Sequence, residues 1–238
     1  MRIIVAGDIH LGRSSSQIPD ETDVDVSAAG AWQRLIDLTI QRQADALLIT
    51  GDLLDREEAY FEARTAIRAG LERLLEARPG LRVVLISGNH DDQSLPRVID
   101  ALCFPEEQVI LLGRDGTWQR TELQGEHFRV TVDGWSYPTS TPRSQPLNQL
   151  DRDRPQGPRL VLLHGDYASS SQYAAIVPAD ARSLATQIDA LLLGHIHFKG
   201  DVQREESPLV LYTGSPQALD PGEPGRHGCW ELNLNSQG

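Results

Sequence analysis

Side chains that could do chemistry gather at the ends of short apolar runs in this sequence. Five of the seven histidines stand there, together with aspartates and an asparagine. The candidate residues are Asp8, His10, Asp52, Asn89, His90, His164, His195 and His197. Imidazole, carboxylate and amide groups without a thiolate suit manganese, iron or zinc better than calcium or magnesium, which prefer all-oxygen ligands. The sequence therefore predicts a transition-metal site.

Spacing within the motifs supports this interpretation. Asp8 and His10 are two residues apart, as are His195 and His197, and side chains two apart on an extended segment point the same way. Taken alone, the first pair fits equally well a strand-end aspartate that caps a turn beside an incidental histidine. Seven ligands are too many for one ion that keeps an open position. Two ions that share a carboxylate fit better, and such pairs catalyse in-line displacement at phosphorus.

The apolar runs that precede these residues have the length and composition of buried strands. Open α/β sheets place ligands at the carboxyl ends of their strands, so these strand ends would bring the set together. Strands are predicted at 2–6, 46–50, 81–87, 108–112, 117–123, 127–133, 159–164, 189–193, 209–213 and 228–234. Helices are predicted over 28–43 and 60–78, and Pro79-Gly80 ends the second. This order favours an α/β fold, with no internal repeat and no domain linker.

Two further features have a plain interpretation. Residues 137–158 hold five prolines. Four arginines lie in or just after this segment, namely Arg143, Arg152, Arg154 and Arg159. Loops of this length are functional or disordered; a solvated surface excursion is favoured, and a substrate-facing loop with phosphate-binding arginines is the alternative.

His127 stands among alternating polar residues, so an exposed strand histidine is expected there.

Composition and charge narrow the class of protein. The 238 residues can bury the core of one large or two small domains, and no apolar run approaches the ~18–20 residues of a membrane helix. The N-terminus lacks a signal-peptide layout, so a cytoplasmic protein is expected.

Cys103 and Cys229 lack CxxC spacing and are expected to be reduced, buried thiols. With 22 basic and 34 acidic residues the net charge is −12, which disfavours non-specific binding of nucleic acid, although two divalent cations would reverse the charge locally.

The motifs, in their order, resemble those of the calcineurin-like metallophosphoesterases. They are Asp8-x-His10, Gly51-Asp52, Gly88-Asn89-His90-Asp91, His164-Gly and Gly194-His195-x-His197. The resemblance spans nearly the whole chain. It implies a four-layer αββα fold, in which two mixed β-sheets pack face to face between helices. It also implies two divalent metal ions, with manganese favoured over iron or zinc.

The resemblance further implies a role for each residue. One ion is expected on Asp8, His10, Asp52 and His197. The other is expected on Asp52, Asn89, His164 and His195, with Asp52 as the bridge. A metal-activated water would attack phosphorus, and His90 would face the scissile phosphate to stabilise charge or protonate the leaving oxygen. Asp91 would orient His90 or cap the turn.

Two segments are similar to the DNA-repair nuclease branch that comprises Mre11 and the SbcD-type exonuclease subunit. Asp8-Ile-His10-Leu-Gly-Arg13 resembles that branch's opening, although Ile9 stands where tryptophan is usual. Tyr212-Thr-Gly-Ser-Pro216, followed by Asp220-Pro-Gly-Glu223 and Gly228, resembles its closing segment. The similarity implies a nuclease that acts on DNA and partners a coiled-coil, SMC-like ATPase. Those nucleases continue into a cap domain and ATPase-docking helices, whereas a single domain over 1–238 is expected here.

Two other functions stay open on the sequence. The acidic composition favours a hydrolase of small phosphodiesters, such as cyclic nucleotides. A metal-free scaffold that binds a protein partner belongs to another class, but nothing except chemistry would require all seven ligands. No membrane contact is expected, and the sequence does not indicate an oligomeric state.

Overall fold

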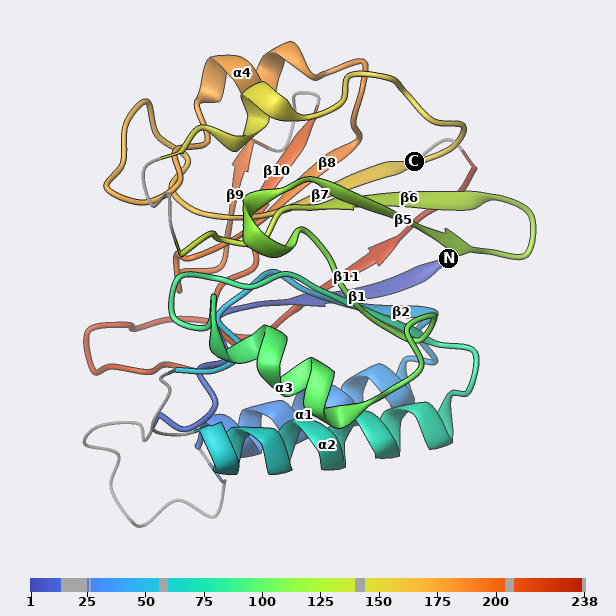
Figure 1. The fold of residues 1–238 in the computed structure, drawn as a ribbon, viewed down its shortest axis with the longest axis vertical. Coiled ribbons are helices and arrows are strands. Elements are labelled where there is room, and N and C mark those ends of the chain that lie inside the picture. The colour runs from blue at the N-terminus through green and yellow to red at the C-terminus, as the bar shows by residue number, and fades with distance from the viewer. Residues whose placement is uncertain (14–24, 26, 56–59, 140–143, 204–207, 237–238) are drawn as a thin grey trace.

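Two β-sheets packed face to face form the body of the protein, and helices cover their outer faces (Figure 1). The computed structural model describes residues 1–13, 25, 27–55, 60–139, 144–203 and 208–236. Each sheet contains both parallel and antiparallel pairs. The expected four-layer αββα arrangement is therefore confirmed.

The first sheet contains the strands that lead to Asp8, Asp52 and Asn89. Its members are β1 (Arg2–Ala6), β2 (Ala46–Ile49), β3 (Arg82–Leu85), β4 (Val109–Leu111) and β11 (Trp230–Asn233), in the order β11-β1-β2-β3-β4. Strands β1 to β4 are parallel, and β11 runs antiparallel to β1. The crossovers are α1 (Ala28–Gln41), α2 (Tyr60–Ala77) and α3 (Ser94–Leu102). Because each crossover returns the chain to the same edge, the parallel strands all end on one side.

The second sheet contains the strands that lead to His164, His195 and His197. Its members are β5 (Gln119–Gln124), β6 (Arg129–Gly134), β7 (Arg159–His164), β8 (Ala190–Gly194), β9 (Gly200–Gln203) and β10 (Leu209–Tyr212), in the order β5-β6-β7-β8-β10-β9. The four central strands are parallel, and β5 and β9 are antiparallel edges. A short helix, α4 (Pro178–Ser183), lies on the outer face of this sheet (Figure 1).

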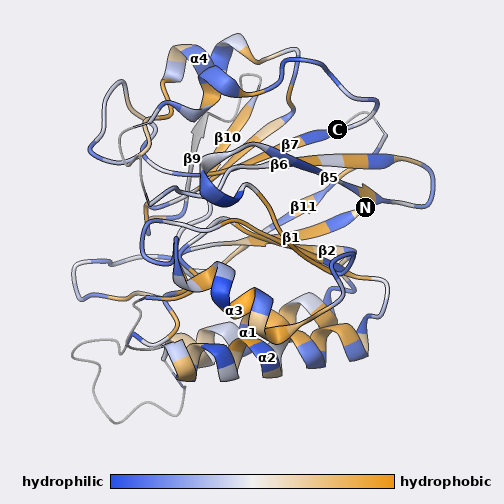
Figure 2. Ribbon diagram, in the orientation of Figure 1, coloured by the Kyte–Doolittle hydropathy of each residue, from blue (hydrophilic) through white to orange (hydrophobic). Residues whose placement is uncertain are grey.

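Alternate side chains of the central strands are buried on opposite faces of each sheet. In β1, Ile3 and Val5 pack between the two sheets, whereas Ile4 and Ala6 pack under the helices. Strands such as β1 and β2 are accordingly apolar along most of their length, as the hydropathy colouring shows (Figure 2). Strands buried on both faces form continuous apolar runs rather than alternating ones, which is why the sequence reveals them so clearly.

Helix α3 is the main element that the sequence does not predict. Only short strands are expected from residue 97 onward, yet Ser94–Leu102 is helical. Pro96 lies in its first turn, where a helix requires no N–H donor, so the proline does not break it. Its apolar positions are buried against the core. The short elements α4 and β9 are also unpredicted, since so few residues show no clear period.

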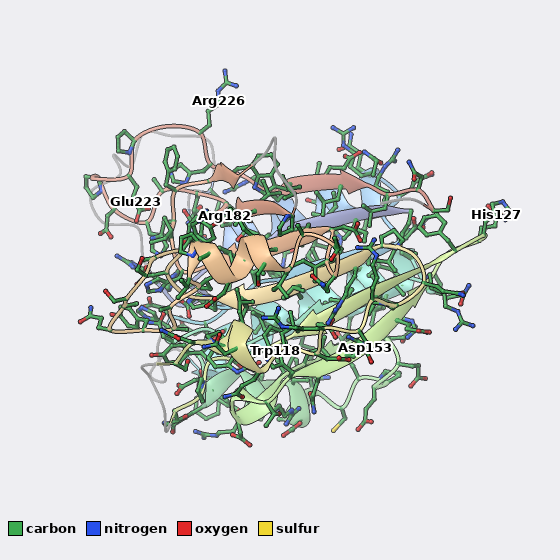
Figure 3. All side chains as sticks on the ribbon, turned by 90° about the horizontal axis from the view of Figure 1, so that it is seen from above. Trp118, His127, Asp153, Arg182, Glu223 and Arg226 are labelled. Carbon is green, nitrogen blue, oxygen red and sulfur yellow. The ribbon has the colours of Figure 1, made fainter. Side chains whose placement is uncertain are left out.

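Smaller expectations are partly borne out. His127 is exposed, but it lies in the turn between β5 and β6 at one end of the molecule (Figure 3). Both cysteines are free, as expected, but neither is fully buried, and Cys229 is half-buried. Cys103 is exposed rather than buried, because it forms the left-handed C-cap of α3 with φ of 53°. Among the described helices, none is long and apolar enough to cross a membrane.

Candidate metal centre

The predicted ligands meet at the edge where the parallel strands of both sheets end. Asp8 and Asp52 follow β1 and β2 within three residues, and Asn89 follows β3. His164 is the last residue of β7, and His195 comes directly after β8. The N-terminus, where β1 begins, is on the right of Figure 1, so this edge is on the left.

Three of the ligands form a first close group. Asp8, His10 and His197 each offer one donor atom, and these atoms lie within 4.8 Å of one another. Nε2 of His10 is 3.1 Å from Nε2 of His197. Nδ1 of His10 is 3.0 Å from Oδ1 of Asp55, and Nδ1 of His197 is 2.6 Å from Oε1 of Glu223. Because an ionised carboxylate only accepts, each Nδ1 is assigned the proton and the two Nε2 lone pairs face each other.

A second group adjoins the first and shares Asp8 with it. Donor atoms of Asp8, Asp52 and His164 also lie within 4.8 Å of one another. Nδ1 of His164 donates to the carbonyl of Thr50 at 2.9 Å, so the lone pair of the neutral ring lies on Nε2. That Nε2 faces Oδ2 of Asp52 at 3.2 Å and Oδ1 of Asn89 at 3.1 Å. Here too, acceptor atoms converge.

His195, which comes from the same sheet as His164, lies beside the second group. Its Nδ1 lies 2.9 Å from Oδ1 of Asn89, and its Nε2 lies 3.4 Å from Oδ1 of Asp166. Its backbone N–H donates to both carboxylate oxygens of Asp8. Burial and the neighbouring His164 lower the pKa of His195 to about 4, so the ring is neutral and can offer a lone pair to a metal.

The cluster has too many buried acceptors for the donors around it. Asp8 is fully buried and Asp52 is 2% exposed. Burial, followed by the negative charge of Asp52, raises the pKa of Asp8. Burial alone would lower the pKa of His164, but the charge of Asp52 raises it to about 9. The buried carboxylates therefore attract a proton, where bound divalent cations would supply the positive charge instead. The imidazole, carboxylate and amide donors suit a transition metal.

His90 lies on the open side of this cluster. Its backbone N–H donates to Oδ1 of Asp52 at 2.9 Å, and its Nδ1 donates to the carbonyl of Asp55 at 3.0 Å. Its ring packs edge-on against His10, with centroids 4.8 Å apart, and its side chain is 37% exposed. His10, Asp55 and His90 form a third close group of donors. In that group both Nδ1 atoms are already hydrogen-bonded to oxygens of Asp55.

Asp91 organises the backbone beneath the cluster. Its carboxylate accepts from the N–H groups of Gly88 at 2.7 Å, Leu53 at 2.7 Å and Leu54 at 3.1 Å. It therefore ties the turn after β3 to the turn after β2, which matches the turn-capping alternative for this residue. Burial, with Asp52 nearby, raises the pKa of Asp91 to about 7.

Backbone strain is concentrated in the same residues. Asp8, His10, Asp52 and His195 have φ of 50°, 53°, 50° and 96°. Residues other than glycine seldom adopt this left-handed conformation, and each costs on the order of 1–3 kcal/mol. Space is equally tight: a Cβ on Gly88 would overlap Oδ1 of Asp52. Strain of this kind persists where the surroundings hold a functional geometry.

Three carboxylates around the histidines are absent from the predicted set. Asp55, Asp166 and Glu223 contact His10, His195 and His197 respectively. Asp55 and Asp166 stand three and two residues beyond a predicted ligand, so proximity in sequence was an available signal for them. Glu223 lies 26 residues after His197; the resemblance of the closing segment includes it, but nothing in the sequence indicates that it contacts His197.

Two arginines in or just after the proline-rich segment, Arg154 and Arg159, pair with carboxylates away from these ligands. Arg159 is fully buried and lies at the start of β7, whereas His164 is at the strand's other end. Its Nε donates to Oδ2 of Asp133 at 2.6 Å. Arg154 pairs with Asp189, just before β8 begins. The substrate-facing alternative is therefore wrong for both; Arg143 lies outside the described residues.

Known proteins with similar sequences place the site in a family. The family model described as calcineurin-like phosphoesterase matches residues 1–199. The DNA double-strand break repair protein Mre11 of Sulfurisphaera tokodaii is 24% identical over 219 residues, which cover 92% of this chain and 54% of that protein. The SbcD subunit of the SbcCD nuclease from Rhodobacter capsulatus is 34% identical over 91 residues, which cover 38% of this chain and 22% of that protein. The chain spans about half the length of the Mre11 relative.

A solved structure shares the fold. The dimetal phosphatase from Danio rerio superposes with a TM-score of 0.58 at 10% identity, and the match covers 90% of this chain and 87% of that one. At this identity the likeness concerns the fold alone. The match of the family model over residues 1–199, with the converging donor groups, shows that the chain belongs to the calcineurin-like phosphoesterase family.

Proposed function

We propose that the chain is a divalent-metal-dependent phosphodiesterase, specifically a nuclease of the Mre11 and SbcD type that acts as an exonuclease. The observation that supports this most is the convergence of buried lone pairs and carboxylates at one strand edge. Two divalent ions bound there would supply an activated water and offset charge on the phosphoryl oxygens. The mixed imidazole, carboxylate and amide donors suit manganese, iron or zinc, and the family resemblance favours manganese among them.

The proposed ligand sets are those that the family resemblance implies, and each overlaps one of the two donor groups. Asp8, His10, Asp52 and His197 would hold the first ion. Asp52, Asn89, His164 and His195 would hold the second. Oδ2 of Asp52 lies 3.8 Å from Nε2 of His10 and 3.2 Å from Nε2 of His164. This position between the groups supports Asp52 as the ligand shared by both ions.

His90 is proposed as the residue that serves the leaving group. The carbonyl of Asp55 holds its Nδ1, which orients the ring and leaves Nε2 toward the open side. A proton on Nε2 could pass to the leaving oxygen, or the charged ring could stabilise the phosphoryl oxygens. Asp55 also holds His10, so one carboxylate-bearing residue positions a ligand and the acid together.

Nucleic acid is proposed as the substrate. Support comes from the names of the relatives, which are a DNA double-strand break repair protein and a component of a nuclease. The second name describes one subunit of a nuclease; a coiled-coil, SMC-like ATPase is proposed as the partner from the resemblance of the sequence motifs. A second candidate substrate is a small phosphodiester, such as a cyclic nucleotide. The net charge of −12 favours it, because an acidic protein repels a polyanion.

The experiment compares substrates on one preparation. Protein reconstituted with manganese is assayed on single- and double-stranded DNA, on cyclic nucleotides and on bis(p-nitrophenyl) phosphate. Cleavage of DNA that stops after chelation supports the nuclease. Cleavage of the aryl diester with intact DNA would reject the nuclease and retain a phosphodiesterase. Absence of bound metal after reconstitution would reject both.

A further inference from the structure

An exposed aromatic side chain lies next to the metal centre. Along residues 195–199 burial alternates: His195, His197 and Lys199 are half-buried, while Ile196 and Phe198 are exposed. Of the three large hydrophobic residues exposed in the described part of the chain, two are therefore in this segment. Phe198 is 69% exposed. Packing does not account for a phenylalanine so open to water one residue from a proposed metal ligand.

The segment that bears Phe198 is anchored on its other side. Nζ of Lys199 donates to the carbonyl of Cys229 at 2.7 Å and lies 4.4 Å from the centre of the Trp230 ring. The ring of Phe198 lies over Gly200, where an added Cβ would come within 3.2 Å of Cε1. The aromatic ring is thus held on a fixed backbone, and most of its surface remains free.

A cavity of about 280 Å³ opens beside this ring. Its lining includes His197, Phe198, Glu223, Pro224, Arg226 and His227. Sites for drug-sized ligands measure roughly 300–1,000 Å³, so this one suits a smaller group such as a single ring system. Because His197 belongs to both, the cavity adjoins the metal centre directly.

The polar groups of the cavity wall are largely occupied. Both ring nitrogens of His227 are hydrogen-bonded, Nδ1 to Ser215 at 3.0 Å and Nε2 to the carbonyl of Glu223 at 3.0 Å. The carboxylate of Glu223 accepts from His197 and from the N–H of Leu219. The surface that remains for a ligand is therefore formed by the flat faces of Phe198, Pro224 and the imidazole of His227.

Arg226 adds a positive charge at the outer rim. Its side chain is exposed and projects from the molecule at the same end as Glu223, opposite to His127 (Figure 3). A guanidinium binds phosphate oxygens through paired N–H groups. The apolar recess thus lies between two groups that could bind phosphate, the metal centre on the inside and Arg226 on the outside, as a base in a nucleotide chain lies between two phosphates.

We propose that Phe198 and this cavity bind the nucleobase of the nucleotide whose phosphate lies at the metal centre. The inference rests on the proposed phosphodiesterase and narrows its substrate to nucleotides or nucleic acid. Stacking on an aromatic ring accepts every base, because each has a π-face. The subsite would therefore favour nucleotidyl esters over other phosphate esters without selecting a sequence.

The test measures binding rather than turnover. Calorimetry on manganese-loaded protein compares adenosine monophosphate with ribose 5-phosphate, which has the same phosphate and sugar but no base. The wild type should bind the nucleotide about 5- to 150-fold more tightly, the range that stacking of one base provides. Phe198→Ala should bring the two affinities close together, and Phe198→Tyr should restore the difference.

The matched control is Phe61→Ala, since Phe61 on α2 is 76% exposed and lies on another element. It should keep the wild-type ratio. Equal affinities in the wild type, an unchanged ratio in Phe198→Ala, or no binding of either compound would each overturn the inference. Cleavage of bis(p-nitrophenyl) phosphate by the wild type is recorded in parallel. If that cleavage persists while the ratio fails, the phosphodiesterase stands and only the nucleobase subsite is lost.

Discussion

The backbone N–H of His195 donates to both carboxylate oxygens of Asp8, at 3.0 and 3.2 Å. Asp8 follows β1 in the first sheet, and His195 follows β8 in the second. The contact therefore joins the two halves of the donor set across the interface of the sheets. Both residues have left-handed backbone conformations, so the junction is built from strained turns that neither sheet would hold alone.

Asp8 and Asp52 are distinguished by a prediction about metal content. The proposed assignment makes Asp52 the shared ligand, although Asp8 belongs to both of the close donor groups that surround it. Asp52→Asn should lose both ions after dialysis against manganese, whereas Asp8→Asn should retain one. Elemental analysis of the folded proteins measures the stoichiometry. The reverse pattern would assign the bridge to Asp8.

His90→Ala is expected to separate metal binding from turnover. Because Nδ1 of His90 is already engaged by the carbonyl of Asp55, the variant should retain the wild-type metal content. Its kcat should fall by about 10²–10⁴, the usual contribution of general acid catalysis. The measurement pairs elemental analysis with hydrolysis of bis(p-nitrophenyl) phosphate. Loss of an ion in this variant would make His90 a ligand instead.

Glu223 is predicted to set the metal affinity through His197. Its carboxylate holds Nδ1 of His197 at 2.6 Å, which fixes the tautomer and directs Nε2 inward. Glu223→Gln should weaken binding of manganese by about 10- to 100-fold, as is typical when the partner of a ligating histidine is changed. The control is Glu126→Gln, whose side chain is 89% exposed in the β5–β6 turn. Equal affinities in the two variants, measured by calorimetry, would count against this role.

The contrast between Glu223 and Asp52 shows how far the sequence can be interpreted. The position of Asp52 can be predicted because a strand buried on both faces is a continuous apolar run, and residues just after its end lie at the sheet edge. Glu223 reaches His197 through an irregular segment, whose path depends on packing rather than on a period. The alternative role of Arg159 as a phosphate-binding residue was wrong for a similar reason. The sequence shows the charge of Arg159, but not that Asp133 is buried in the fold and pairs with it.

Gly88→Ala tests whether the close packing around Asp52 matters for the site. An added Cβ would overlap Oδ1 of Asp52 and come within 2.6 Å of Cε1 of His164. The variant should therefore bind metal and hydrolyse substrate much less well, while its circular dichroism stays close to the wild type. Gly80→Ala is the matched control, because nothing lies within 4 Å of its Cβ position. If Gly88→Ala keeps the full metal content, as Gly80→Ala should, the added methyl group does not displace the carboxylate of Asp52 and the prediction is wrong.

Arg159 is predicted to act on stability and not on the reaction. Its side chain is fully buried, and besides Asp133 it donates to the carbonyls of Asp151 at 2.7 Å and Asp153 at 3.1 Å. Removing one partner of a buried pair costs roughly 3–5 kcal/mol when the remaining charge is left unpaired, but Asp133 keeps an ion pair with Arg120 at 2.7 Å. Arg159→Met should therefore lower the free energy of unfolding by about 3 kcal/mol or less, measured by urea titration.

The control for Arg159→Met is Arg129→Met, since Arg129 is 61% exposed and pairs with Glu122 on the surface. Exposed pairs contribute about 0–1 kcal/mol, so this variant should unfold near the wild-type midpoint. Folded Arg159→Met should keep the wild-type metal content and KM, because the residue lies at the opposite end of β7 from His164. A raised KM with unchanged stability would return Arg159 to the role of a phosphate-binding arginine.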